Sequence, residues 1–291
     1  MIAQRPLGGS GLASSVLGMG CSRLGSLLTA GGERRAERAL EAALAHGISF
    51  FDTADVYAQG DSERLLGRVL GRAADVTIAT KAGYLLPAPM WALRLAKPPL
   101  RLAARLRGKV GRSLAARRRQ GYAQSFDPEH LRRALRGSLK RLDRDRIDLF
   151  LLHNPPPEIA DDETLWRFVE DSKRSGELRC FGVSCGGGDG DIVWLRQPAV
   201  EIVQVPLGPD GAATDGFLAG AAERNVGVIA HQILGGPGRH EAAEIEAALR
   251  RTLSRPEVGV ALVGMTQPEH VRATGALVHR VALPAPIARS A

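Results

Sequence analysis

Short apolar runs alternate along the chain with longer amphipathic segments, and this alternation occurs eight times. Each apolar run is four to six residues long and almost free of polar positions, which is typical of parallel strands buried on both faces. The predicted strands span residues 15–20, 48–52, 76–81, 147–152, 180–184, 202–205, 226–230 and 259–263.

An amphipathic segment with helix signals follows each strand. The predicted helices span residues 33–45, 61–71, 128–142, 161–175, 190–197, 212–224, 241–254 and 268–277. Asp127 before Pro128 gives one helix an N-cap and a proline at its first position, and Gly47 and Gly176 mark helix ends. Eight strand–helix units predict an α/β fold of the (β/α)8 TIM-barrel type; a doubly wound sheet with an extra domain would alternate in the same way.

The N-terminal segment 5–12 has a glycine-rich turn between two short extended pieces, and it predicts a β-hairpin that caps the bottom of the barrel. The chain has 291 residues, 44% of them hydrophobic and 24% charged, which is enough apolar material for one sizeable core. We therefore expect a single barrel domain over residues 1–291.

One basic insertion, residues 84–124, interrupts the rhythm between the third strand and its helix. It contains ten Lys or Arg and no Asp or Glu, so the rest of the chain is slightly acidic although the formal net charge is +8. Leu102, Leu106, Val110 and Leu114 recur every four residues, which predicts basic helices interrupted at Pro98-Pro99. We favour a lid over the catalytic face; a solvated surface, or a segment that binds a membrane, nucleic acid or a protein, is the alternative.

Location and metal content follow from simpler signals. The chain has no apolar run long enough for a signal peptide or a membrane span, and its three cysteines have no disulfide spacing, so we expect a cytoplasmic protein. The histidines at 231, 240, 270 and 279 lack ligand spacing with the cysteines, so we expect no metal site.

Four polar residues fall at or just beyond the carboxyl ends of successive predicted strands, where barrel active sites lie. They are Asp52, Tyr57, Lys81 and His153. Each alone has an ordinary structural interpretation, as a cap, a packing residue or a core histidine. Their joint placement at one mouth favours catalysis, because core packing does not select polar residues at successive strand ends.

These four residue types suit carbonyl reduction. Tyr57 can donate the proton, and a neighbouring Lys81 ammonium would lower the pKa of the phenol. Asp52 would keep Lys81 charged and positioned, and His153 would orient the substrate carbonyl.

The chain also resembles a known family, the aldo-keto reductases, through motifs that occur in the same order over nearly its whole length. These motifs are Asp52-Thr53-Ala54-Asp55-Val56-Tyr57 with Ser62-Glu63 and Leu66-Gly67, Thr80-Lys81, Ile147-Asp148-Leu149 with Leu152-His153, Gly182-Val183-Ser184, Val203-Gln204, and Gly264-Met265-Thr266-Gln267-Pro268-Glu269. The resemblance implies a barrel that binds an extended nicotinamide dinucleotide, with the same four residues as its catalytic set.

The resemblance also implies cofactor contacts along the carboxyl ends of the strands. The implied residues are Gly20 and Cys21 near the nicotinamide ribose, Ser184 and Gln204 at the carboxamide, Leu234 and Gly235 at the pyrophosphate, and Gly264, Thr266, Gln267 and His270 around the adenosine phosphate. The glycine run 186–188 is either a further phosphate contact or a plain loop.

Several positions depart from the family pattern. Leu207 replaces an aromatic residue that stacks on nicotinamide, and Cys185 replaces an asparagine. Gln267 stands where many members carry a basic residue for the 2′-phosphate, Ala273-Thr274 replaces a Glu-Asn pair, and Arg272 is a nearby substitute. The resemblance implies NADPH as cofactor, and these departures leave NADH possible.

The resulting hypothesis is an NAD(P)H-dependent oxidoreductase that reduces an aldehyde or ketone, with Tyr57 as general acid. The alternatives are an NAD-dependent dehydrogenase of a sugar or other alcohol, and a repurposed barrel that acts as a binding or regulatory protein through residues 84–124. The expected partner is a small carbonyl substrate, with no nucleic acid; the sequence leaves the oligomeric state open.

Overall fold

The computed structural model describes residues 1–25, 32–71, 73, 75–86, 123–209, 213–235, 238 and 240–284. Its parallel strands are β3 (Leu17–Gly20), β4 (Phe50–Asp52), β5 (Thr77–Ala82), β6 (Ile147–His153), β7 (Leu178–Ser184), β8 (Ile202–Pro206), β9 (Gly227–His231) and β10 (Val258–Gly264). They close into a barrel in the order β10-β3-β4-β5-β6-β7-β8-β9. The predicted TIM barrel is confirmed.

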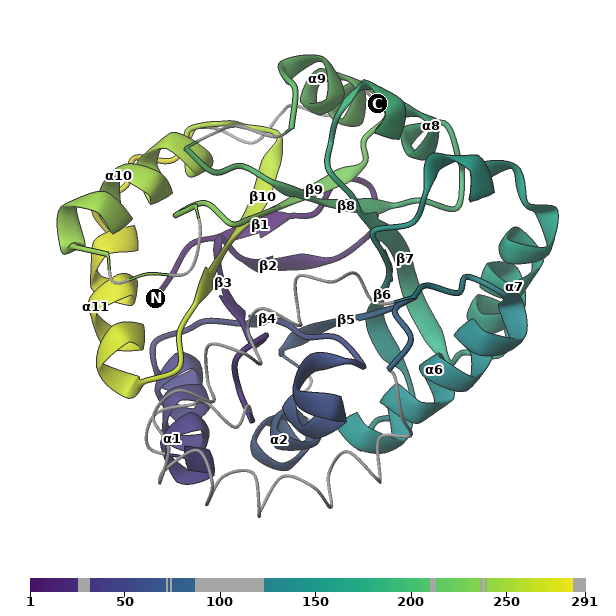
Figure 1. Ribbon diagram of the computed structural model, residues 1–291. Coiled ribbons are helices and arrows are strands. Elements are labelled where there is room, and N and C mark those ends of the chain that lie inside the picture. Colours follow the sequence, from purple (N-terminus) through teal and green to yellow (C-terminus); the bar gives the residue numbers. More distant parts are fainter. Residues whose placement is uncertain are drawn as a thin grey trace.

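Helices surround the barrel, as Figure 1 shows. They are α1 (Gly32–Ala45), α2 (Asp61–Leu70), α6 (Pro128–Leu142), α7 (Glu163–Arg174), α8 (Ile192–Leu195), α9 (Asp215–Glu223), α10 (Ala242–Leu253) and α11 (Pro268–Val278). Three 3-10 turns, η1 (Tyr57–Gly60), η2 (Pro157–Asp161) and η3 (Asp189–Asp191), precede α2, α7 and α8. Asp127 caps α6 as predicted, because its carboxylate accepts the Glu129 and His130 amides.

The two faces of each strand pack into different cores. The barrel interior is filled by Leu7, Leu12, Phe50, Ala79, Leu149, Leu151, Cys180, Ile202, Ile229, Val260 and Leu262. Alternate strand residues such as Phe51, Ile78 and Phe150 point outward and pack under the helices. This two-residue period determines which side chains reach the mouth.

The interior layer nearest the carboxyl ends therefore consists of the residues two positions after the inner apolar ones. This layer contains Gly20, Asp52, Lys81, His153, Ser184, Gln204, His231 and Gly264. A polar ring thus lies directly above an apolar plug, at the end of the barrel where active sites are found.

The N-terminal hairpin closes the opposite end of the barrel. Strands β1 (Gln4–Pro6) and β2 (Ala13–Ser15) pair antiparallel, as predicted. Leu7 and Leu12 from the connecting turn enter the barrel interior, and Gly9 N–H donates to the Asn225 carbonyl at 2.7 Å. Ser15, which we had assigned to the first barrel strand, belongs instead to the hairpin, and the barrel strand begins at Leu17.

The helix predicted over 190–197 is wrong in length, since η3 and the single turn of α8 occupy most of that span. The Arg196 and Gln197 amides bond three residues back, to Val193 and Trp194, so the turn tightens instead of continuing. Helices α7 and α9 begin later than predicted, because Asp162 and Thr214 cap them at the Thr164 and Phe217 amides.

The two ends of the basic insertion meet directly after β5. Tyr84 and Gln124 form an antiparallel bridge, and Leu85 N–H donates to the Ala123 carbonyl at 2.7 Å. Residues 87–122, which include the predicted basic helices and the proposed lid, lie outside the described residues.

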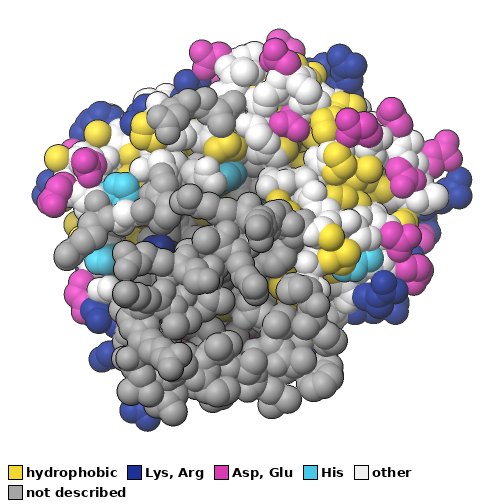
Figure 2. Space-filling model, viewed as in Figure 1, with side chains coloured by type: hydrophobic (Ala, Val, Ile, Leu, Met, Phe, Trp, Pro, Cys, Tyr) yellow, Lys and Arg dark blue, Asp and Glu magenta, His cyan; other side chains and the backbone are white. Residues whose placement is uncertain are grey.

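The described surface carries both signs of charge. In Figure 2, acidic and basic side chains are interspersed around the rim of helices, in agreement with the slightly acidic balance outside residues 84–124. No helix among the described residues is long and apolar enough to cross a membrane.

Replacement of Leu7 by alanine tests the plug at the bottom of the barrel. Leu7 is fully buried against Gly227 and Gly259, so Leu7→Ala should lower the free energy of unfolding by about 2–5 kcal/mol. Denaturant unfolding followed by circular dichroism measures this change. Leu44→Ala, on the exposed side of α1, is the matched control and should cost less than about 1 kcal/mol; equal losses would show that the hairpin does not close the barrel.

Candidate active site

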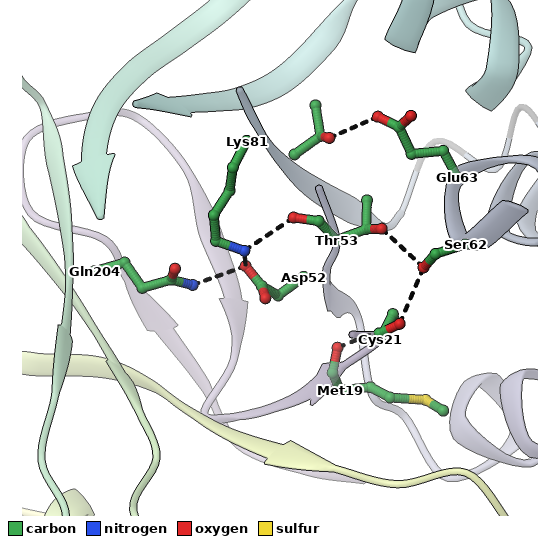
Figure 3. A network of polar contacts seen from close by, with 9 residues as sticks. Met19, Cys21, Asp52, Thr53, Ser62, Glu63, Lys81 and Gln204 are labelled. Carbon is green, nitrogen blue, oxygen red and sulfur yellow. Dashed lines mark hydrogen bonds and ion pairs between the residues drawn. The ribbon is translucent and has the colours of Figure 1, made fainter. Parts of the chain in front are cut away.

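A buried ion pair lies at the centre of the mouth. Lys81 Nζ donates to Asp52 Oδ1 at 2.6 Å and to the Thr53 carbonyl at 2.9 Å, and the Lys81 side chain is only 2% exposed. Gln204 Nε2 donates to the same Asp52 oxygen at 2.7 Å, from a strand on the opposite side of the barrel. Figure 3 shows this convergence on Asp52.

Tyr57 lies beside the ammonium group, and His153 packs against the Tyr57 ring. Lys81 Nζ lies 5.1 Å from the centre of the Tyr57 ring, and the Tyr57 and His153 rings meet edge to face at 5.9 Å. The four residues predicted as catalytic are therefore brought together, from β4, η1, β5 and β6.

Their protonation states follow from burial and from one another. Burial lowers the pKa of Lys81, but Asp52, Tyr57 and the hydrogen bonds to both raise it by more, so the lysine is charged. Burial, together with Lys81 and His231, lowers the pKa of His153 to about 3, so this imidazole is neutral at physiological pH.

The expected lowering of the Tyr57 pKa is wrong in its net direction. Burial of the phenol raises the pKa, and the Lys81 charge and hydrogen bond offset only part of that effect. Tyr57 is consequently a protonated phenol at neutral pH. The lysine still acts on it in the predicted sense.

The loop that carries Tyr57 has an unusual backbone. Ala58 and Gln59 both have positive φ, 51° and 57°, a conformation that L-residues adopt at a cost. A chain of hydrogen bonds holds the surrounding segments: Thr53 Oγ1 and Ser62 Oγ lie 2.8 Å apart, and Ser62 Oγ donates to the Cys21 carbonyl at 3.0 Å (Figure 3).

A second buried acidic group lies next to this loop. Glu63 accepts from Thr80 Oγ1 at 2.6 Å and from Arg141 Nε at 2.5 Å. Asp55 is buried beside Glu63, and its Oδ1 has no hydrogen-bond partner among the described residues. Burial first, and the Glu63 charge second, raise the pKa of Asp55 to about 8, with Arg141 opposing.

Two adjacent glycines leave space in the polar ring. Gly20 and Gly264 are register partners on β3 and β10, and a Cβ at Gly264 would meet nothing within 4 Å. Ser184 and Gln204 face the same mouth from β7 and β8. A flat ring needs open space on one side and polar side chains that can hydrogen-bond it on the other. The two glycines and the Ser184 and Gln204 side chains therefore fit a nicotinamide.

The other predicted cofactor residues lie farther from the centre of the mouth, except Cys21, which directly follows Gly20. Thr266 and Gln267 connect β10 to α11, His270 is exposed in the first turn of α11, and Leu234 and Gly235 follow β9. Cys21 is fully buried, and its N–H donates to the Asp52 carbonyl at 2.8 Å.

Sequence reasoning missed two aromatic residues at the mouth. Tyr84 packs edge to face on His153 at 4.6 Å and accepts a hydrogen bond from Asn154 Nδ2 at 2.9 Å. His231 ends β9 and belongs to the inner polar layer. The position of His231 at a strand end, the criterion used for His153, was the available signal.

Two departures from the family pattern have a structural explanation. Leu207 and Cys185 are buried, and both side chains pack in the larger hydrophobic core. Burial raises the pKa of the Cys185 thiol, which favours the packing role.

The glycine run 186–188 is a self-contained turn. The Gly187 and Gly188 amides donate to Asp191 Oδ2 at 2.8 and 3.3 Å, so an internal carboxylate already occupies the donors that a phosphate would need. No cluster of potential metal ligands occurs in the described part of the chain.

Asp55→Asn tests the buried acidic pair. The pKa of Asp55 is raised above its unfolded value of about 3.9, so its contribution to stability is present below pH 4 and lost as the pH rises through about 8. The variant mimics the protonated acid. Its free energy of unfolding relative to wild type should rise over this interval by at most about 1.4 kcal/mol per pH unit.

Denaturant unfolding of both proteins from pH 4 to pH 9 measures the difference, and the other titrating groups cancel. A pH-independent difference between Asp55→Asn and wild type would contradict the raised pKa of Asp55.

Comparison with known proteins agrees with this geometry. A sequence model of the Aldo/keto reductase family matches residues 16–251. The chain is 30% identical to D-threo-aldose 1-dehydrogenase from Pseudomonas sp over 233 residues, which cover 77% of this chain and 67% of that protein. It is 34% identical to 6-dehydroglucose reductase from Novosphingobium aromaticivorans over 199 residues, 62% of this chain, and spans about half the length of that relative, 51%.

A solved structure has the same fold. An aldo-keto reductase from Klebsiella pneumoniae in complex with NADPH superposes with a TM-score of 0.67 at 22% identity, over 97% of this chain and 92% of the other. The family model matches most of the chain, and the motifs and the polar ring agree with it. The chain belongs to the aldo/keto reductase family.

Proposed function

We propose that the chain is an NAD(P)H-dependent oxidoreductase that reduces an aldehyde or ketone to an alcohol, with Tyr57 as the proton donor. The observation that carries this proposal is a protonated phenol, Tyr57, that lies beside a buried, charged lysine and in ring contact with a neutral imidazole, His153. The mouth therefore contains a protonated acid that can donate its proton and a neutral imidazole that can donate a hydrogen bond.

The division of labour follows from the contacts. Asp52 holds Lys81 in one position, and the ammonium stabilises the phenolate that Tyr57 becomes after it gives up its proton. His153 ends β6 at the mouth and contacts the Tyr57 ring, so its neutral imidazole could hydrogen-bond a substrate carbonyl there. The imidazole would orient the carbonyl oxygen toward Tyr57.

The reduction requires a hydride and a proton. A bound NADPH or NADH would supply the hydride to the carbonyl carbon. Tyr57 transfers its proton to the carbonyl oxygen, and water reprotonates the phenolate after the alcohol leaves. Gly20 and Gly264 would make room for the dinucleotide. The Ser184 hydroxyl and the side-chain oxygen of Gln204, Oε1, would bind the carboxamide.

A second candidate function differs in the direction of the reaction and in the class of substrate. One relative bears the name D-threo-aldose 1-dehydrogenase, so oxidation of a sugar hydroxyl with NAD as acceptor is the alternative; the name of another, 6-dehydroglucose reductase, agrees with reduction of a sugar carbonyl. We further propose a single barrel that works in a reducing compartment such as the cytoplasm, because all three cysteines are free and buried.

Tyr57→Phe tests the proton donor. Loss of the phenol should lower kcat for carbonyl reduction by about 10²-fold or more, while the dissociation constants for NADPH and NADH change less than about twofold. Tyr84→Phe removes a neighbouring hydroxyl that accepts a hydrogen bond from Asn154, and its effect on kcat should be much smaller. Near wild-type turnover by Tyr57→Phe would overturn the mechanism.

Cofactor titration comes before the kinetics. Calorimetry with NADPH and NADH should give a micromolar dissociation constant for at least one of them. Binding of neither would overturn the oxidoreductase proposal and favour a barrel that serves as a binding protein.

A further inference from the structure

Two short segments, residues 83–85 and 123–125, pair antiparallel beside the end of β6, and we call them the neck. Backbone hydrogen bonds of 2.7 and 2.8 Å join the segments on either side of the Tyr84–Gln124 bridge pair. A hydrogen-bonded pair of this kind has a fixed register, so both side chains of the bridge pair are held in defined places.

The base of the neck is packed onto the barrel. Gly83 has a φ of 136°, and a Cβ at this position would meet the Phe126 ring at 2.4 Å. Phe126 packs in turn against the larger hydrophobic core. The close approach of the ring to a residue without a side chain fixes where the neck leaves the barrel.

The strand that carries His153 lacks a partner on one side at its end. On the β5 side, the pairing of β6 stops at Leu152 opposite Ala82. On the β7 side it continues to His153 opposite Ser184. Sheet pairing therefore holds the backbone of His153 from one side only, and the neck lies where the other strand has ended.

The Gln124 amide supplies hydrogen bonds to this strand end. Its Nε2 donates to the His153 carbonyl and to the Asn154 carbonyl, both at 2.9 Å. Asn154 has a φ of 52°, a left-handed conformation that surrounding contacts must hold in place. Both N–H donors of the amide are thus used on the backbone at the point where β6 turns away from the barrel.

The Tyr84 ring contacts the imidazole of His153 itself. The two ring centres lie 4.6 Å apart at an angle of 76°, closer than the Tyr57 ring at 5.9 Å. The Tyr84 hydroxyl accepts a hydrogen bond from Asn154 Nδ2 at 2.9 Å, so the phenol is joined to the same strand end as Gln124. The neck therefore contacts His153 through both its backbone and its ring.

We propose that Tyr84 and Gln124 are positioning residues for His153. Gln124 fixes the backbone at the open end of β6, and Tyr84 fixes the orientation of the ring, so that the imidazole N–H points at the carbonyl oxygen of the substrate. Orientation matters here because a hydrogen bond weakens steeply when the donor is misaligned. Both residues act through His153, and the proposal rests on the proposed function.

Loss of either contact should lower kcat more than cofactor binding. Gln124→Ala and Tyr84→Leu should each lower kcat for carbonyl reduction about tenfold, because a misaligned donor leaves less of the bound substrate in a reactive geometry. The dissociation constants for NADPH and NADH should change less than about twofold. Tyr84→Phe keeps the ring and should restore kcat to within about threefold of wild type. Ala123→Ser, at an exposed side chain of the neck, is the matched control and should stay within about twofold.

A double-mutant cycle with His153→Ala tests whether the two residues act through the imidazole. In that background Gln124→Ala and Tyr84→Leu should change kcat less than about twofold, because the ring that they position is gone. A general loosening of the mouth would instead lower kcat by the same factor with and without His153, and that result would overturn the proposal.

Nitrogen NMR of protein labelled at histidine gives a readout that does not depend on activity. Gln124→Ala should shift and broaden the imidazole signals of His153, which are identified by their loss in His153→Ala, and should leave those of His279 unchanged. Unchanged His153 signals would overturn the positioning role. If the alanine variant has a much lower thermal midpoint, Gln124→Glu takes its place, since an ionised carboxylate of the same shape cannot donate.

The outcomes separate the two proposals. If wild type reduces no aldehyde or ketone with NADPH or NADH, the proposed function is overturned, and the NMR comparison still decides whether the neck fixes His153. If wild type is active and both Gln124→Ala and Tyr84→Leu retain its kcat, the positioning role is overturned and the proposed function stands.

Discussion

The ion pair between Lys81 and Asp52 is the interaction on which the rest of the mouth depends. Both groups are almost fully buried, and a charge removed from water is tolerated only with a partner at close range. Lys81 meets this requirement through Asp52 and the Thr53 carbonyl, and Gln204 adds a second donor to the same carboxylate. The barrel is thereby connected across its own interior at the polar mouth.

Burial at the mouth also determines which of its side chains carry a proton. It keeps the Tyr57 phenol protonated and the His153 imidazole neutral, while the close carboxylate keeps Lys81 charged. The same physical cause therefore acts in opposite directions on different groups, because burial always disfavours the charged form and only specific partners reverse it. Asp55 is buried next to Glu63, and its Oδ1 has no hydrogen-bond partner among the described residues. Arg141 offsets only part of the effect of burial, so the pKa of Asp55 stays raised.

The two ends of the barrel have separate tasks. Leu7 and Leu12 seal the amino-terminal end with apolar contacts that contribute stability. The carboxyl-terminal end carries the polar ring, the Gly20–Gly264 gap and the connection to α11. A substitution at one end can therefore change folding or chemistry largely without the other.

The sequence by itself determined the barrel, the hairpin and the four polar positions that meet at one mouth, because buried parallel strands have a local apolar signature and residues at their ends share one mouth. It did not determine the short α8, whose amides bond three residues back, nor the direction of the Tyr57 pKa, which depends on burial by distant segments. His231 and Tyr84 were recognised only when the strands were closed. Gln124 met the His153 carbonyl only through the pairing of the two segments of the neck, a long-range contact that no local pattern encodes.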